Sequence, residues 1–265
     1  MVSRIPPQRF EVRLARNKVE VQAAQRLRYQ VFYEEMGAQP APETAATARD
    51  CDLFDSLCDH LLVIDHCARG AHTPAVVGTY RLTRRSRLPR GQEFYTESEF
   101  DLGNLKQISG EIVELGRSCV HPEYRNRAIL DMLWRGLGEY IATYDIQLMF
   151  GCASFPGTDP DAVAEALAFL DAHCLAPETL RPRARHGQYI SMRRLGDMLP
   201  DRRRALRQMP PLIRGYLSAG CHVGDGAVVD TQFNTTDICV MIETENLSDS
   251  YARRYQPGAM MATAA

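Results

Sequence analysis

A strand, a short basic turn and an amphipathic helix follow one another directly in residues 112–144. The strand, IVELGRSCV, ends at Val120, and the turn carries Arg125 and Arg127. Free backbone N–H groups and the helix dipole converge at a helix N-terminus, so this unit predicts an anion site. A plain strand–helix unit with a solvated basic turn is the alternative. The helix is predicted from apolar residues at close to a 3.6-residue period, namely Leu130, Leu133, Trp134, Leu137, Tyr140, Ile141 and Tyr144.

The basic turn resembles, with one departure, the donor-binding motif of the GNAT acyltransferase superfamily. In that family an Arg/Gln-x-x-Gly-x-Gly/Ala turn holds the pyrophosphate of the acyl donor. Here the turn is YRNRAIL, from Tyr124 to Leu130, and contains no glycine. Glycines let a backbone approach phosphates closely, so their absence weakens the case for coenzyme A. A donor on acyl carrier protein, which offers a single phosphodiester, makes less demand on the turn.

A series of further motifs extends the resemblance from about Leu27 to Tyr255. The order LRYQVFYEE, DLFD, GTYRL and ELGR is similar to that of acyl-homoserine-lactone synthases. The segments GCASFPGTDP, PPLIRGYL and DTQFNTTD resemble the ornithine-lipid type of amino-acid N-acyltransferase, the hemolysin-like GNAT branch. The resemblance implies an α/β (α+β) fold with a mixed, mostly antiparallel sheet flanked by helices. We expect one domain, with a core at about 10–175 and a helical C-terminal elaboration at about 176–255.

Composition excludes several other classes of protein. The chain has 265 residues, 45% of them hydrophobic and 24% charged, with a net charge of −2, so no global field attracts nucleic acid. No run approaches the roughly 18 apolar residues that a membrane span needs, and the N-terminus lacks an apolar signal core. We therefore expect a cytoplasmic protein whose 8 cysteines are reduced.

Arginines cluster at 84–90 and at 193–207. Such clusters are solvated surface or docking patches for an acidic carrier protein or an anionic membrane. In the second cluster, the segment from Arg202 to Leu217 is either a peripheral membrane contact or a buried helix with a solvated basic flank. A zinc site at Cys58, His60, His66 and Cys67 is disfavoured, because the run LLVID holds the two histidines a strand apart. We expect neither a metal nor a cofactor.

Local signals predict the remaining elements. A capping box at Asn17 and Glu20 opens a helix that ends at Gly37, and residues 38–50 form a loop able to act as a lid. A helix begins at Asp159-Pro160, and another spans Arg204–Ala219, broken or started by Pro210-Pro211. Strands are expected at His60–Cys67, Ala75–Thr83, Ile112–Val120, Ile146–Phe155 and Ile238–Glu243, with a turn at 71–74.

Glu114 is the candidate general base for deprotonating an amine that attacks a thioester. A carboxylate in an apolar strand is costly unless paired, and Arg117 is its nearest partner in sequence. Positions three apart face opposite sides of a regular strand, so a bulge at Gly116 is needed to bring them together. The alternative is a buried Glu–Arg pair that only holds the strand.

Other candidate residues surround the expected substrates. Asp52 and Asp55 suit the ammonium groups of an amino-acid acceptor, or else they cap a helix. Arg28 and Arg81 suit its carboxylate or the donor phosphate, through bidentate contacts. The side chain of Phe32 either shapes the tunnel that holds the acyl chain or packs in the hydrophobic core. Ser154 lacks the G-x-S-x-G context of a nucleophile, which favours direct transfer.

The resemblance implies transfer of a 3-hydroxylated acyl group from acyl carrier protein to the α-amino group of L-ornithine. N-acyl amino acid synthesis with glycine, glutamine or another amino acid is an alternative. A non-catalytic acyl-binding or membrane-associated protein is another.

Overall fold

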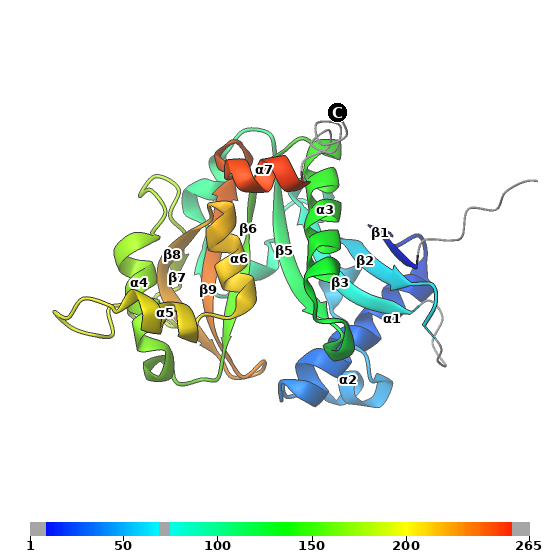
Figure 1. Cartoon of the computed structure of the whole chain (residues 1–265), viewed down its shortest axis with the longest axis horizontal. Helices are drawn as coiled ribbons and strands as arrows, with labels where there is room; N and C mark the ends of the chain where they lie inside the picture. The colour runs from blue at the N-terminus through cyan, green and yellow to red at the C-terminus, as the bar shows by residue number, and fades with distance from the viewer. Residues whose placement is uncertain (1–8, 69–74, 256–265) are drawn as a thin grey trace, which may run out of the picture.

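The computed structural model describes residues 9–68 and 75–255, so the predicted turn at 71–74 lies outside the described residues. Nine strands form a sheet in the order β1-β2-β3-β5-β6-β9-β8-β7-β4 (Figure 1). Neighbouring strands are antiparallel except for the pairs β5–β6 and β7–β8. The predicted mixed, mostly antiparallel sheet flanked by helices is confirmed. The strands are β1 Phe10–Leu14, β2 Asp59–Asp65, β3 Val76–Arg84, β4 Phe100–Asp101, β5 Glu111–Val120, β6 Ile146–Pro156, β7 Arg183–Ala184, β8 His222–Asp230 and β9 Thr235–Glu243.

The helices begin where the sequence supplies caps. Asn17 and Asn126 each accept a hydrogen bond from a backbone N–H three residues ahead, whereas Asp159 caps a 3₁₀ turn that leads into a helix. The α-helices are α1 Lys18–Tyr29, which continues as a π-helix over Gln30–Glu35, α2 Pro42–Thr47, α3 Arg127–Thr143, α4 Ala164–His173, α5 Arg202–Gln208, α6 Pro211–Ala219 and α7 Asp249–Tyr255. Short 3₁₀ segments occupy Leu53–Ser56, Arg85–Arg87, Tyr95–Ser98, Gly103–Gln107, Pro122–Tyr124, Pro160–Val163 and Thr244–Asn246.

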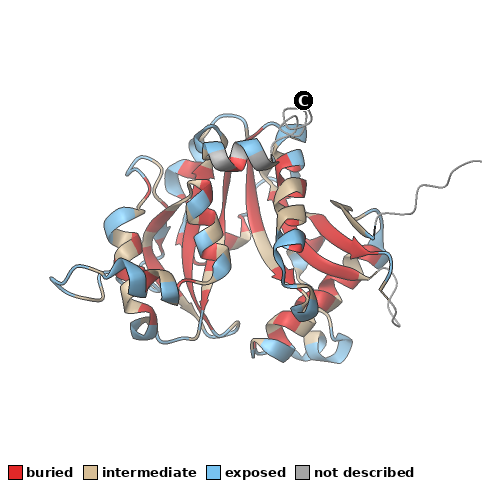
Figure 2. Cartoon of the chain, viewed as in Figure 1, coloured by how far each residue is buried: buried red, intermediate tan, exposed pale blue. Residues whose placement is uncertain are grey.

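Both faces of the sheet are covered, as the unbroken apolar run in β2 requires (Figure 2). Successive side chains of a strand point to opposite faces. Leu61 and Val63 accordingly pack in the cluster that contains α3, α4 and α6, whereas Leu62 and Ile64 pack against α1. A third cluster covers the C-terminal half of the sheet with residues from the segment between β3 and β5. The helices thus cover the two faces of the sheet, so the ends of the strands are left to form a binding site.

Several sequence predictions need correction. Residues 38–50 contain the helix α2. The predicted break at Pro210-Pro211 is present, because Pro210 separates α5 from α6, but the first of these helices begins at Arg202 and not at Arg204. The strands β1, β4, β7 and β8 and the helix α7 were not predicted, and β9, the last strand along the chain, lies inside the sheet between β6 and β8. The carboxylate of Glu20 accepts from Arg13 and the Arg16 N–H, so only half of the predicted capping box forms. None of the described helices is both long and apolar enough to cross a bilayer.

The parallel strands β5 and β6 pair only along their first halves. Their register runs from Glu111 opposite Ile146 to Glu114 opposite Phe150, and no pair follows. Gly151 comes directly after the last pair, and a Cβ there would clash with the carbonyl oxygen of Leu115. A glycine lets the two backbones approach closely at this point, after which they diverge (Figure 1).

Candidate active site

A cavity of about 560 Å³ lies where β5 and β6 part, a size typical of small-molecule sites. Leu115–Val120 form one wall and Cys152–Ser154 the other. Phe32 and Phe233, whose ring centroids are 6.1 Å apart, join the two sides, and the Gln39 N–H donates to the Gln232 carbonyl nearby. Among the predicted site residues, six line this cavity: Phe32, Arg81, Glu114, Arg117, Arg125 and Ser154.

The predicted bulge in β5 is present, and it turns Arg117 toward the cavity. Thr79 and Arg81 of β3 lie opposite Cys119 and Gly116, so β5 carries one extra residue. Arg117 takes up the irregularity with a φ of 50°, a left-handed conformation that is uncommon outside glycine. Glu114 and Arg117 both line the cavity as a result. The expected Glu114–Arg117 pair does not form, because Arg117 contacts Asp50 and Asp52 instead.

Glu114 is buried at the end of the paired part of β5. Its carboxylate accepts from the backbone N–H groups of Tyr95 and Thr96, at 3.3 and 2.6 Å. Burial raises the pKa of Glu114 above the ordinary value of a glutamate, although these two hydrogen bonds oppose the rise. A carboxylate held in place, with a raised pKa, on a cavity wall has the properties of a general base.

Three arginines and three aspartates form a neutral ion cluster beside the cavity. Asp50 Oδ2 lies 2.7 Å from Arg28 Nε and 3.2 Å from Arg117 Nε. The guanidinium of Arg28 also donates to both oxygens of Asp55, at 2.8 and 2.9 Å. Both Arg28 and Asp55 are buried and do not line the cavity.

Asp52 completes this cluster from the segment that precedes β2. Its carboxylate lies 2.7 Å from Arg81 Nη1 and 3.5 Å from Arg117 Nη2. Asp52 and Asp55 also form a capping box around the 3₁₀ turn Leu53–Ser56. Their proposed contact with the acceptor ammonium stays a prediction, as does that of Arg28 with an anionic group. The structure gives these three residues arginine or aspartate partners.

The basic turn before α3 places its two arginines differently. Arg125 forms an ion pair with Glu35 and donates to the Val120 carbonyl, and it lines the cavity. Arg127 is largely exposed, with a side-chain exposure of 79%, and has a loose 3.9 Å contact with Asp131. Leu130, predicted on the apolar face of the helix, is exposed and contributes to the cavity lining. The turn therefore lies at the edge of the cavity, next to the start of α3.

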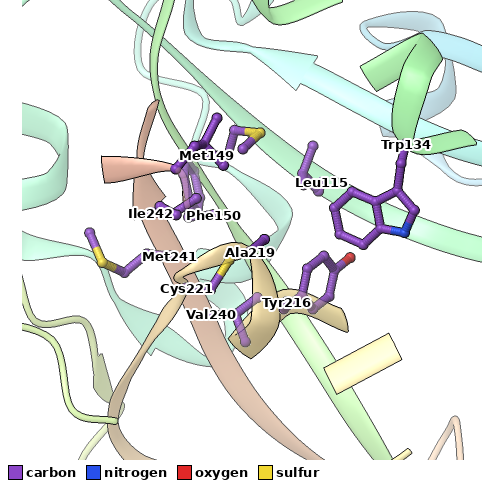
Figure 3. A pocket seen from close by; sticks show the side chains of 11 residues that line it. Leu115, Trp134, Met149, Phe150, Tyr216, Ala219, Cys221, Val240, Met241 and Ile242 are labelled. Atoms are coloured by element: carbon purple, nitrogen blue, oxygen red, sulfur yellow. The ribbon is translucent and has the colours of Figure 1, made fainter. Parts of the chain in front are cut away.

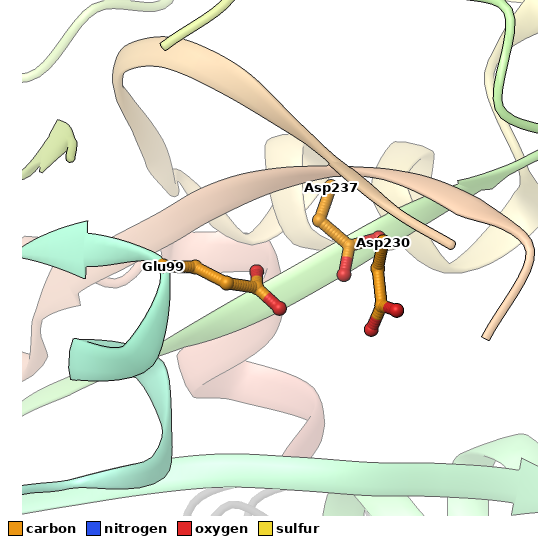
Figure 4. A group of neighbouring side chains, drawn as sticks. All are labelled: Glu99, Asp230 and Asp237. Carbon is orange, nitrogen blue, oxygen red and sulfur yellow. The ribbon is translucent and has the colours of Figure 1, made fainter. Parts of the chain in front are cut away.

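A second acidic group lies at the other side of the cavity and was not predicted. The carboxylates of Glu99, Asp230 and Asp237 lie within 4.8 Å of one another (Figure 4). Asp230 and Asp237 line the cavity, and Glu99 is buried. In the parts of the chain that the structure describes, no other group of His, Cys, Asp or Glu side chains converges in this way.

The hairpin of β8 and β9 explains how two of these acids meet. Asp230 lies opposite Thr235, and Asp237 is two residues further along β9, so both acids point to one face. The segment DTQFNTTD contains both residues, and its two aspartates flanking a tight turn were the available signal. Burial and the charge of Asp237 raise the pKa of Glu99. Burial and the charge of Asp230 raise the pKa of Asp237.

A small, wholly apolar void of about 10 Å³ shares part of its lining with the main cavity, and Figure 3 shows the side chains around this void. Leu115, Trp134 and Tyr216 line both spaces. The rest of its wall comes from the core of β6, β9 and α6. The cavity thus has an apolar end between the sheet and the helices.

The cysteines and histidines considered for zinc are spread over β2 and its ends. His60 contacts the Asp55 carbonyl and Cys58 contacts Thr83, whereas His66 and Cys67 are exposed at the far end. All eight cysteines are free thiols, as the sequence predicted.

The chain is similar to a known family and to several known proteins. Residues 27–135 match the family model described as acetyltransferase (GNAT) domain. The chain is 43% identical to the L-ornithine N(alpha)-acyltransferase of Rhodobacter capsulatus, covering 94% of this chain and 95% of the relative. It is 42% identical to the protein of the same name from Brucella abortus, covering 93% and 88%. The crystal structure of the AHL synthase LasI aligns over 93% of this chain and 94% of LasI, with 13% identity and a TM-score of 0.49.

Proposed function

Because this chain belongs to the L-ornithine N(alpha)-acyltransferase family, we propose that it acylates the α-amino group of L-ornithine. The donor would be a 3-hydroxyacyl thioester of acyl carrier protein, and the product a lyso-ornithine lipid. The observation that carries this proposal is the cavity between β5 and β6, which has Glu114 and Arg117 on its wall. It combines a buried base, cationic groups and an apolar end in one space.

The proposed reaction is a direct transfer. The amino nitrogen of the acceptor attacks the thioester carbonyl carbon, Glu114 takes up the proton of the amine, and the thiolate leaves as the amide forms. Arg81 and Arg117 line the cavity and would bind the acceptor carboxylate, since a guanidinium has five N–H donors and can serve a ligand as well as its aspartate partners. No covalent enzyme intermediate is required. Burial raises the pKa of Cys152 well above the ordinary value, which disfavours a thiolate nucleophile there.

The proposal of a carrier-protein donor is supported by the turn before α3. It contains no glycine that would let the backbone enclose a pyrophosphate. Arg127 and the first N–H groups of α3 are available at the edge of the cavity for one phosphodiester. The acyl chain would run past Leu115 toward the apolar end that Trp134 and Tyr216 line.

A peripheral contact with an anionic membrane is also proposed, because the product is amphiphilic. Met209, Ile213 and Tyr216, three apolar residues of the segment from Arg202 to Leu217, are buried in the core. The exposed apolar residues of this region are instead Met198 and Leu199, with 69% and 88% exposure, on the loop before α5 (Figure 1). The exposed arginines Arg202, Arg203, Arg204 and Arg207 lie on α5, directly after this loop.

The proposal is tested with purified protein and 3-hydroxyacyl-carrier protein. Mass spectrometry should detect N-acylornithine, and glycine and glutamine should give much less product. A parallel series with the acyl-coenzyme A of equal chain length should show lower kcat/KM. Equal efficiency with coenzyme A would remove the carrier-protein part of the proposal. Absence of any N-acyl amino acid with either donor would remove the enzymatic function itself.

A further inference from the structure

Asp237 is the most unusual carboxylate of the cavity wall. The residue is 5% exposed, yet its Oδ1 has no hydrogen-bond partner among the described residues. A buried polar atom without a partner is costly, and native proteins keep such atoms mainly where a ligand or a water satisfies them. Since Asp237 lines the cavity, the partner of this oxygen is expected there.

The neighbours of Asp237 are carboxyl groups as well. Glu99 and Asp230 bring their carboxylate oxygens within 4.8 Å of Asp237, and Figure 4 shows the three groups directed toward one another. In the described parts of the chain, no Arg, Lys or His forms an ion pair with any of them. By contrast, Asp50, Asp52 and Asp55 are fully matched by three arginines. The cavity therefore has one side where aspartates and arginines balance, and one acidic side that has no ion-pair partner among the described residues.

The acidic side is linked to the candidate base. Cys152 Sγ lies 3.4 Å from Glu99 Oε2 and 3.8 Å from Thr96 Oγ1. The Thr96 N–H in turn donates to Glu114. Cys152 and Thr96 both line the cavity, so an acceptor placed along this wall can meet Glu114 with one end and Asp237 with the other.

We propose that Asp237, Asp230 and Glu99 bind the side-chain ammonium group of the acceptor and so select an amino acid with a second, terminal amine. This inference rests on the proposed function and names the determinant of its acceptor specificity. An alkylammonium group offers three N–H donors, which match three carboxylates. Hydrogen bonds between charged partners in a buried site give strong discrimination against an acceptor that lacks the amine.

The test compares L-ornithine with L-norvaline, which has the same carbon chain without the terminal amine. Asp237→Asn should raise the KM for ornithine about 10- to 100-fold, the effect of losing one charged hydrogen bond, with the KM for norvaline nearly unchanged. Asp230→Asn, at a half-buried position, should act in the same direction and decides the question if Asp237→Asn does not fold. Asp225→Asn is the matched control, because Asp225 is also on β8 but pairs with Arg183 away from the cavity.

The outcomes separate the two proposals. If the wild-type protein acylates ornithine but the variants weaken ornithine and norvaline equally, the ammonium site is wrong and the proposed function stands. If the wild-type protein acylates neither amino acid, the proposed function fails first. Mg²⁺ or Ca²⁺ supplied without an amino acid is the third arm. A rise in melting temperature with the metal that Asp237→Asn abolishes would identify a metal site instead.

Discussion

Arg28 and Asp55 form a bidentate ion pair, at 2.8 and 2.9 Å, in which both side chains are buried. Breaking one partner of such a pair leaves an uncompensated charge inside the protein. Asp55→Asn should therefore lower the free energy of unfolding by about 3–5 kcal/mol, measured by denaturant titration. The KM for ornithine should stay nearly unchanged, because Asp55 does not line the cavity. Asp161→Asn, which affects an exposed pair with Arg194, is the control and should cost little. If Asp55→Asn instead increases the KM for ornithine and leaves stability unaltered, Asp55 contacts the acceptor.

Removing the carboxylate charge of Glu114 tests the base. Glu114→Gln keeps the shape of the side chain and should lower kcat by about 10²- to 10⁴-fold, the usual contribution of a general base. Glu97→Gln is the control, since Glu97 is also a buried carboxylate near Tyr95 but does not line the cavity. A folded Glu114→Gln protein with wild-type turnover would exclude Glu114 from proton transfer.

The acidic side of the cavity should make stability depend on pH. Burial, with the charge of Asp237, raises the pKa of Glu99 from 4.5 to about 8, and that of Asp237 rises from 3.8 to about 6. A raised carboxyl pKa means that the folded state holds a proton which the unfolded state has lost. Its stabilisation is complete below the unfolded pKa and disappears as the pH rises through the folded pKa. The melting temperature should hence fall between about pH 4 and about pH 8.

Glu99→Gln should weaken this pH dependence and raise the melting temperature at pH 8 relative to wild type, as measured by calorimetry. Glu165→Gln, on the surface-facing start of α4, should leave the profile as it is. An unchanged slope in Glu99→Gln would show that other groups cause the dependence. Ornithine should reduce the slope as well, because a bound ammonium favours the ionised carboxylates.

Leu115 lines both the main cavity and the apolar void and should influence acyl-chain length. Leu115→Ala should enlarge the space between them, so kcat/KM should shift toward longer acyl chains in a competition among donors. The substitution should also cost about 2–5 kcal/mol of stability. Leu167→Ala truncates another buried leucine, on α4 and in the lining of neither space, and should destabilise without altering the preference for acyl-chain length. If both variants show the same preference for acyl-chain length, the acyl chain does not bind near Leu115.

Membrane binding should depend on α5. Arg202→Gln with Arg203→Gln should reduce co-sedimentation with anionic vesicles at low salt, because each basic residue near such a surface contributes about 1 kcal/mol. High salt and neutral vesicles should reduce it in the wild type. Arg87→Gln with Arg90→Gln changes two exposed arginines of the other cluster and should have no effect. If the wild type and both double variants bind anionic vesicles equally, α5 does not contact the membrane and its arginines are only solvated.

The elements that local rules predicted are those with a regular pattern and a clear cap. β2, β3, β5 and β6 are apolar runs, and α3 combines a 3.6-residue period with the cap Asn126. β8 was missed because its sequence, HVGDGAVVD, is diluted by two glycines and an internal aspartate. Its strand character comes from pairing with β9, which no local window contains.

The candidate site divides in the same way. Glu114 was found because a carboxylate in an apolar strand violates a local rule, and Arg117 because the same strand carries a bulge signal. Asp50 and Glu99 lie in irregular segments, where acidic residues look solvated by default. Only the tertiary fold buries them: Asp50 lies against arginines, and Glu99 lies against two other acidic residues. Sequence reasoning also could not tell which aspartates near the cavity already had partners.

Gly151 lies where β5 and β6 stop pairing, and a methyl group at this position would meet the backbone of Leu115. The spacing between these two strands, and with it the width of the substrate space, depends on the absence of a Cβ atom at Gly151. Gly151→Ala would alter catalysis by pushing the two strands apart, without changing the charge of any group. An inventory of reactive side chains overlooks such a position, although it sets how closely the two strands that carry the cavity walls approach each other.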